Sequence, residues 1–125
     1  MSRNWLPFAV GNVPVVDVRI DTRRYRALLD TGSQVSLVAP DVAAKLGLRE
    51  IGFQAIVGVT GGARREFAVE LPPIGLARIE LPPCRAAVSE LKHLGLWIQL
   101  ILGVNAFRQH RLQFDFVESR VYFLE

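Results

Sequence analysis

The sequence predicts an all-β fold with one or two short helices. Short segments in which apolar and polar residues alternate recur along the chain, and this is the pattern of strands with one solvent-exposed face. Clusters of glycine, proline and polar residues separate these segments and are typical of turns. The chain has 125 residues and contains no internal repeat, low-complexity stretch or linker, so one domain over residues 1–125 is expected.

The first predicted hairpin leads into the motif on which the functional argument depends. Residues 13–21 alternate between apolar and charged side chains, and residues 25–29 repeat the pattern. The polar link between them is short, so the two strands are expected to pair directly. Asp30, Thr31 and Gly32 follow at once, and the motif is therefore predicted to lie at the end of a strand.

A short helix and a long hairpin are predicted for the middle of the chain. Residues 35–38 favour a strand, and residues 40–46 favour a helix that begins at a proline and stops at Gly47. Residues 54–59 and 65–71 then flank a glycine-rich connection, which is typical of a hairpin.

The last part of the chain is predicted to be mainly strands. Paired prolines delimit two of them, at residues 74–81 and 84–88. The apolar run 97–103 predicts a strand buried on both faces, followed by a helical turn over residues 105–109. A final hairpin is expected over residues 112–124.

Composition and charge exclude several classes of protein. Hydrophobic residues make up 50% of the chain, which fits a globular domain and excludes a disordered tail. The net charge of +3 comes with grouped arginines but no recognisable reading module, so no nucleic-acid partner is expected. The most apolar window, residues 94–104, is far shorter than the ~20 residues of a spanning helix. A soluble domain without membrane contact is therefore expected; its location stays open, and the cytoplasm is permitted.

The sequence lacks the residues that several kinds of site require. Cys84 is the only cysteine, so neither an intramolecular disulfide nor a cysteine-based zinc site can form. His93 and His110 are the only histidines, and two widely separated histidines are a weak basis for a metal centre. HExxH, Walker-type and dinucleotide GxGxxG motifs are absent. We therefore expect no metal and no cofactor.

The segment Asp30-Thr31-Gly32-Ser33 is the best candidate for chemistry. All four residue types also form ordinary turns, so the tetrapeptide alone decides little. It follows the apolar strand Ala27-Leu28-Leu29, however, which would carry a carboxylate toward the protein interior. A carboxylate there is costly unless it is paired or functional, so the context favours a functional aspartate.

With these features the chain resembles the retropepsin-like aspartic proteases over most of its length. Three elements match in order: residues 27–33 as the catalytic strand and loop, residues 57–63 as a glycine-rich flap, and residues 101–105 as the segment that braces the loop. The resemblance implies a closed acid-protease barrel with a β-hairpin flap. Because the sequence holds a single motif, it also implies a homodimer that cuts polypeptides with one Asp30 from each subunit.

The resemblance further implies a role for each matching residue. The two Asp30 carboxylates would share a proton and activate a water, because carboxylates ~3 Å apart cannot both ionise. Thr31 would interlock across the dimer axis, Gly32 would allow close approach to the carboxylates, and Ser33 would donate a hydrogen bond to Asp30. The implied substrate-binding residues are Val57, Gly58, Val59, Thr60, Gly61, Gly62 and Ile101, and the implied brace residues are Leu102, Gly103 and Asn105.

The chain also departs from the retroviral pattern. Retroviral members carry an acidic residue and an arginine, which form an ion pair, at the positions of Gln34 and Val104. Both are missing together here, and the final hairpin is longer than a short dimerisation strand requires. The pattern is therefore closer to cellular and bacterial members and suggests a differently built dimer.

Two questions stay open at the level of sequence. Val35, Val57, Val59 and Ile101 suit the walls of a substrate pocket and the hydrophobic core equally well. The missing ion pair also leaves an alternative to a protease, namely a catalytically silent module of the same fold that dimerises or binds peptides. A domain that stays monomeric and inactive by itself is a third possibility.

Overall fold

The computed structural model describes residues 4–57 and 61–124, and within these residues the predicted all-β class is confirmed. None of the helices in the described ranges is long and apolar enough to cross a membrane. The elements in chain order are β1 (Trp5–Pro7), β2 (Val15–Ile20), β3 (Arg23–Leu29), β4 (Ser36–Val38), α1 (Pro40–Lys45), β5 (Glu50–Val57), β6 (Ala63–Leu71), β7 (Ile74–Leu76), β8 (Ile79–Leu81), β9 (Cys84–Val88), the 3₁₀ turn η1 (Lys92–Leu94), β10 (Leu100–Leu102), the 3₁₀ turn η2 (Val104–Ala106), β11 (Arg111–Asp115) and β12 (Arg120–Leu124).

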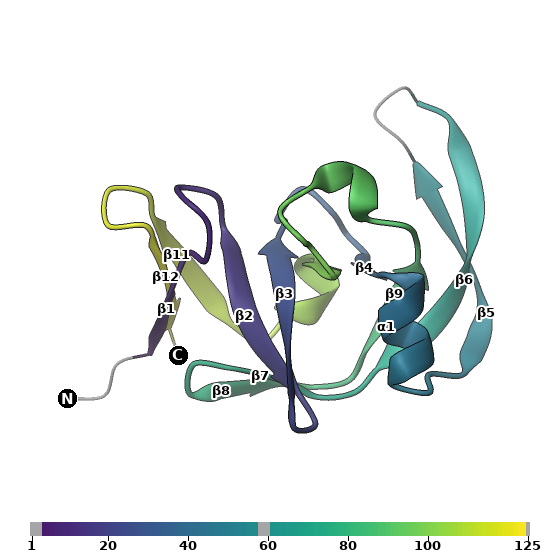
Figure 1. Ribbon diagram of the computed structural model, residues 1–125, viewed down its shortest axis with the longest axis horizontal. Helices are drawn as coiled ribbons and strands as arrows, with labels where there is room; N and C mark the ends of the chain where they lie inside the picture. The colour runs from purple at the N-terminus through teal and green to yellow at the C-terminus, as the bar shows by residue number, and fades with distance from the viewer. Residues whose placement is uncertain (1–3, 58–60, 125) are drawn as a thin grey trace.

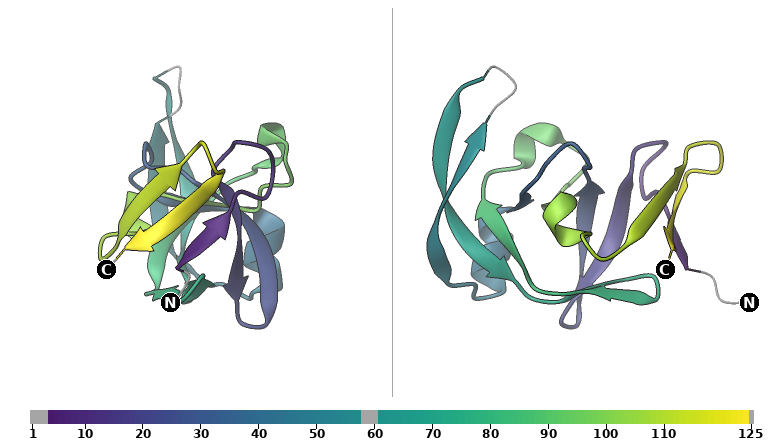
Figure 2. Two further views of the ribbon diagram at one scale, coloured as in Figure 1. Left: turned by 90° about the vertical axis from the view of Figure 1, so that its left-hand side faces the viewer. Right: turned by 180° about the vertical axis from the view of Figure 1, so that it is seen from behind.

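Two sheets organise these strands (Figure 1). The large sheet has the order β5-β6-β9-β4-β10-β3-β2-β7-β8, and the small sheet has the order β1-β12-β11. Figure 2 shows the small sheet at one end of the molecule and the β5–β6 hairpin at the other. The pairing found among the described residues leaves β5 and β8 as edges of the large sheet, so a closed barrel stays a prediction.

The hairpin of β2 and β3 lies near the middle of the large sheet and carries the motif. The alternating pattern places Val16, Val18 and Ile20 in the core, while the charged side chains between them face outward. β10 pairs with β3 in parallel, with Leu102 opposite Leu29. The carboxyl ends of these two strands therefore lie side by side, directly beneath the predicted catalytic loop.

The predicted long hairpin is formed by β5 and β6, which run antiparallel from the Val57–Ala63 pair at the tip to the Glu50–Val69 pair at the base. The base is anchored because β6 also pairs with β9, and nearer the tip Arg64 Nη2 donates a hydrogen bond to Ser89 Oγ (2.7 Å). The hairpin projects beyond the rest of the molecule (Figure 1). The flap residues Gly58, Val59 and Thr60 lie outside the described residues.

Three predicted elements differ from the structure. Residues 74–81 form the two strands β7 and β8, because Ala77 adopts a left-handed φ of 51° and reverses the chain. In the segment 97–103 only Leu100–Leu102 is a strand, since Trp97 also has a positive φ and its side chain turns into solvent. The helical turn predicted at 105–109 begins earlier and is the 3₁₀ turn Val104–Ala106.

Candidate active site

Asp30 lies directly after β3, at the point where β3 and β10 end together. Its amide N–H donates to the carbonyl of Leu102 on β10 (3.0 Å), which extends the parallel pairing into the loop. Asp30 is half-buried, whereas Thr31 and Gly32 are exposed. The Asp30 carboxylate therefore lies at the edge of the sheet where β3 and β10 end, and it is accessible to a molecule outside the chain.

The loop folds tightly around the Asp30 carboxylate. The amide N–H of Gly32 donates to Asp30 Oδ1 (2.9 Å), and a Cβ at Gly32 would lie 3.2 Å from the same oxygen. Glycine at this position therefore allows both the bond and a close approach to the carboxylate.

Ser33 does not make the hydrogen bond expected from the family resemblance. Its hydroxyl donates to the carbonyl of Val35 (2.6 Å), because the loop turns back after Gln34 and presents that carbonyl to it. The amide N–H of Ser33 donates to the backbone carbonyl of Asp30 (3.2 Å). In the single chain, the Ser33 hydroxyl therefore stabilises the turn of the loop, and it is the Gly32 amide that donates a hydrogen bond to the Asp30 carboxylate.

Gly103 closes the loop from the other side, as a brace residue should. A Cβ at Gly103 would lie 2.5 Å from the carbonyl oxygen of Ser33 and 3.0 Å from that of Val35. The next residue, Val104, donates its amide N–H to the same Ser33 oxygen (2.8 Å). Only a residue without a side chain allows the two segments to pack at this distance.

A buried polar network behind the loop includes Ser36, a residue that the sequence reasoning missed. The Ser36 hydroxyl, which is fully buried on β4, accepts the amide N–H of Gly103 (3.0 Å) and donates to Asn105 Oδ1 (2.8 Å). Asn105 in turn donates from Nδ2 to the carbonyl of Arg85 (2.7 Å). The detectable signal was a lone serine within an apolar strand, since a buried hydroxyl needs a partner.

Cys84 borders this network. Burial raises the pKa of the Cys84 thiol, the nearby Glu70 raises it further, and a hydrogen bond with Ser36 partly opposes the rise. A thiol kept in its neutral form is a poor nucleophile. Cys84 is therefore a structural residue of the brace, in agreement with the lack of a motif around it.

The predicted substrate-binding residues are divided between solvent and core. Val57 is 71% exposed near the tip of the hairpin, and Gly61 and Gly62 beyond it are also exposed. Ile101 is only 7% exposed and belongs to the core cluster, which favours the core among the two roles considered for it. Val35 is half-buried beside the loop.

A cavity of about 230 Å³ opens next to the Asp30 carboxylate. Apart from the catalytic loop and its brace, its walls are apolar side chains together with one histidine. The residues beyond β3 and β10 are Val104, Phe107, His110, Leu112 and Phe114. No cluster of three His, Cys, Asp or Glu residues that could hold a metal ion occurs in the described part of the chain.

Comparison with known proteins agrees with this geometry. The family profile described as "Aspartyl protease" matches residues 16–106, which include the motif, the hairpin and the brace. The chain belongs to this aspartyl protease family. The match also covers all of β3 to β10 and β2 except its first residue, so the family assignment extends to the sheet that supports Asp30.

Sequence relatives point to cellular members of the family. The chain is 23% identical over 122 residues to DNA damage-inducible protein 1 of Neurospora crassa, covering 95% of this chain and 27% of the relative. It is 28% identical over 103 residues to the UBA domain-containing protein Mud1 of Schizosaccharomyces pombe, covering 80% of this chain and 30% of the relative. The chain therefore spans less than a third of the length of either protein.

Solved structures confirm the retropepsin-like fold. A retropepsin-like aspartic protease from Rickettsia conorii superposes with a TM-score of 0.67 at 14% identity, covering 95% of this chain and 87% of that chain. The retroviral protease-like domain of Ddi1 from Leishmania major gives a TM-score of 0.56 at 20% identity, covering 90% and 93%. The predicted resemblance to cellular and bacterial retropepsin-like proteins is thus confirmed.

Proposed function

We propose that the protein is an aspartic endopeptidase whose active site forms when two copies associate. The observation that carries the proposal is the placement of Asp30: an accessible carboxylate, hydrogen-bonded by Gly32 at the shared end of two parallel strands. The chain contains one such motif, so the second carboxylate must come from a second chain.

The chemistry follows from two carboxylates that share one proton. The ionised Asp30 takes a proton from a water, whose oxygen attacks the carbonyl carbon of the scissile peptide bond. The protonated Asp30 of the other subunit gives its proton to the carbonyl oxygen. Collapse of the tetrahedral intermediate breaks the C–N bond, and the proton taken from water passes to the leaving nitrogen. One hydroxyl of the intermediate returns a proton to the Asp30 that had given one, which restores the shared proton and yields a carboxyl and an amine product.

The cavity beside Asp30 supports an interface at this face of the molecule. Leu112 and Phe114 on β11 form part of its wall, next to the catalytic loop. Among the described residues, β11 is also one of the two edge strands of the small sheet, and edge strands can pair with a further strand. We infer that a second copy covers this face, which would remove apolar surface from water and bring the two Asp30 residues together.

The β5–β6 hairpin suits the role of a flap in the proposed enzyme. Its base pairs with β9, Arg64 nearer the tip donates a hydrogen bond to Ser89 Oγ, and Val57 is exposed toward solvent. An extended polypeptide beneath such a hairpin would bind through β-type backbone hydrogen bonds and apolar side-chain contacts. Closure over the substrate would exclude water from the reacting bond.

A cleavage assay with a peptide library tests the proposal. The wild-type protein should cut peptides in a range from acidic to neutral pH, and a pepstatin-type transition-state mimic should inhibit the reaction. Asp30→Ala and Asp30→Asn should abolish cleavage while sedimentation and circular dichroism show an unchanged fold and dimer. Activity equal to wild type in these variants would refute the mechanism.

The same experiment distinguishes the catalytically silent alternative. The positions of the retroviral ion pair are occupied by Gln34 and Val104, so the loop here depends on backbone bonds and on the Ser36 network. A silent module predicts peptide binding or dimer formation without turnover at any pH. A sample that stays monomeric over a concentration series would instead show that the catalytic unit needs a further assembly signal.

A further inference from the structure

A hydrogen bond near the tip of the β5–β6 hairpin connects it to the segment that follows β9. Arg64, the second residue of β6, donates from Nη2 to Ser89 Oγ (2.7 Å). The pairing of β6 with β9 begins only at Ala68, so residues 63–67 project beyond it. Of the hydrogen bonds that join the hairpin to other described residues, this one lies nearest the tip. It is therefore placed to set the position of the projecting part.

Two partners fix the direction of the Arg64 guanidinium. Its Nε lies 2.9 Å from Glu66 Oε1, while Nη2 reaches Ser89. Arg64 and Glu66 are two residues apart on one strand, so their side chains lie on the same face of the hairpin. The planar guanidinium has fixed N–H directions and can serve both partners at once. The Arg64 side chain is 59% exposed, so it can leave Ser89 without placing an unpaired charge in the interior.

Ser89, on the other side of the bond, is held firmly by the body of the protein. It is only 4% exposed, and its amide N–H donates to the carbonyl of Val38, the last residue of β4 (3.0 Å). Leu91, two residues further on, is buried in the hydrophobic core. The Ser89 hydroxyl is therefore a fixed point, and the hairpin is the part that can move away from it.

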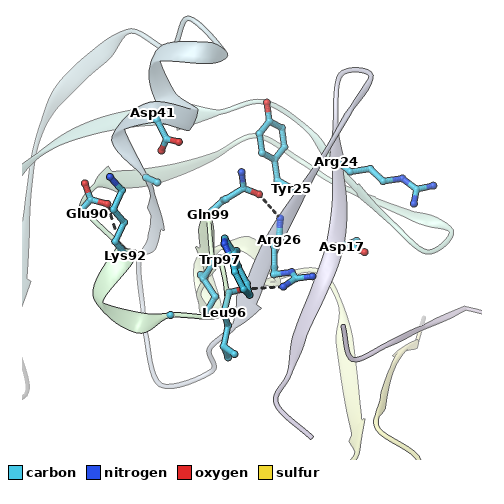
Figure 3. Close-up of a pocket in the computed structure, with 13 residues that line it drawn as sticks. Asp17, Arg24, Tyr25, Arg26, Asp41, Glu90, Lys92, Leu96, Trp97 and Gln99 are labelled. Carbon is cyan, nitrogen blue, oxygen red and sulfur yellow. Dashed lines mark hydrogen bonds between the residues drawn. The ribbon is translucent and has the colours of Figure 1, made fainter. Parts of the chain in front are cut away.

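The segment after Ser89 is also bonded to β3, the strand that leads to Asp30. The backbone N–H of Arg26 on β3 donates to Gln99 Oε1 (2.9 Å), and the Gln99 amide N–H donates to the Arg26 carbonyl (2.9 Å). The Arg26 guanidinium donates to the Leu96 carbonyl (3.0 Å). Figure 3 shows Arg26 between its Gln99 and Leu96 partners. Ser89 is thus part of a segment that is fixed relative to the strand carrying the catalytic aspartate.

We propose that Arg64 is a positioning residue, whose bond to Ser89 holds the projecting part of the hairpin at a set position relative to Asp30. We call the pair Arg64 and Ser89 the latch. The proposal rests on the proposed function, in which the hairpin covers the substrate. A hairpin that is already held in place loses less freedom when a polypeptide binds, so the latch favours binding. Release of Arg64 into solvent lets the hairpin move aside when product leaves.

Amide hydrogen exchange tests the latch in the full chain, without any catalysis. Arg64→Gln and Ser89→Ala should each speed up exchange about fivefold in residues 55–57 and 63–66, because the detached strands fray more often. Residues 68–71, which pair with β9, should exchange as in wild type. Unchanged exchange in both variants would overturn the proposal.

Arg65→Gln is the matched control, because it removes the same charge from the next residue. Arg65 lies on the opposite face of the hairpin, with its guanidinium carbon 4.5 Å from the centre of the Phe53 ring. Exchange in this variant should stay within about twofold of wild type. An effect as large as that of Arg64→Gln would show that the loss of charge, and not the loss of the latch, is the cause.

The double variant Arg64→Gln/Ser89→Ala tests whether the two residues act through one bond. Either substitution alone removes that bond, so the double variant should exchange at the same rate as each single variant. If the two effects multiply, the residues act independently and the latch is refuted.

Steady-state kinetics separate a positioning role from a merely structural one. With both proteins folded by circular dichroism, Ser89→Ala should raise the KM for a cleaved peptide about threefold and change kcat less than about twofold. Equal KM values would overturn the positioning role. Faster exchange in the variants of a protein that never cleaves peptides would count against the proposed protease alone. Cleavage by a protein whose exchange ignores both substitutions would count against the latch alone.

Discussion

Single residues determine the geometry of the catalytic loop through the space that they leave and the bonds that they accept. Gly32 leaves room beside Asp30 Oδ1, and Gly103 leaves room beside the Ser33 carbonyl. The Ser36 hydroxyl on β4 accepts a hydrogen bond from the Gly103 amide and so links Gly103 to β4. The glycines were predictable because they belong to motifs with a fixed spacing. Ser36 has a sequence signal, a lone serine within an apolar strand, but its partners could not be predicted because they lie far from it in the sequence.

Gly103→Ala should destabilise the protein, because the added methyl group meets a backbone oxygen at 2.5 Å and cannot be relieved by rotation of a side chain. The expected loss is about 1–3 kcal/mol in the free energy of unfolding, measured by urea denaturation. Gly62→Ala is the matched control for stability, since nothing lies within 4 Å of a Cβ at that position. Equal stability of the two variants would contradict the tight packing of the brace.

Cys84 should make stability depend on pH in the alkaline range. Burial raises the pKa of the thiol in the folded state, so the folded protein holds this proton more tightly than the unfolded chain does. The contribution to stability is therefore complete below the thiol's ordinary pKa and is lost as the pH rises toward the raised value. Urea denaturation at pH 7 and pH 10 should show a smaller fall in stability for Cys84→Ala than for wild type. Equal falls would contradict the assignment.

At the scale of elements, the strands that follow from local pattern were predicted and those that depend on distant partners were not. The β2–β3 and β5–β6 hairpins have alternating side chains and turn residues within a few positions of each other. β1, in contrast, exists because Trp5 meets Tyr122 near the other end of the chain. The turn at Ala77 contains none of the residues that usually mark turns, so β7 and β8 were predicted as one strand.

The strand predicted from hydrophobicity was also wrong for the segment before β10. The run from Trp97 onward is apolar, and an apolar run predicts burial. The chain turns Trp97 outward by means of left-handed backbone angles, which the residue types themselves disfavour.

The exposed edge of β11 is the element on which the proposed dimer depends. Phe114→Glu would place a charge in the cavity wall beside Asp30 and should raise the dissociation constant of the dimer at least ~tenfold, as measured by analytical ultracentrifugation. Val117→Glu adds the same charge to the exposed turn between β11 and β12 and should have little effect. A dimer that tolerates Phe114→Glu, with the fold intact by circular dichroism, would place the interface elsewhere.

At the scale of the whole molecule, the sequence allowed the family and the sheet that supports Asp30 to be predicted, because the motif, the hairpin and the brace occur in a fixed order. The dimer interface could not be derived in the same way. It depends on which apolar surfaces stay uncovered after the chain has folded, and that is a property of the complete tertiary structure. The cavity beside Asp30 and the edge of β11 are recognised as parts of the proposed interface only when both are seen in the folded chain.

The parallel pairing of β3 with β10 also determines when during synthesis the site can exist. Asp30 is translated well before Leu102, the last residue of the strand that positions it. At about 5–20 residues per second, a nascent chain spends several seconds with its aspartate exposed and its loop unformed. The site around Asp30 therefore cannot form on a nascent chain before β10 has been synthesised, which follows from the order of the strands in the sheet.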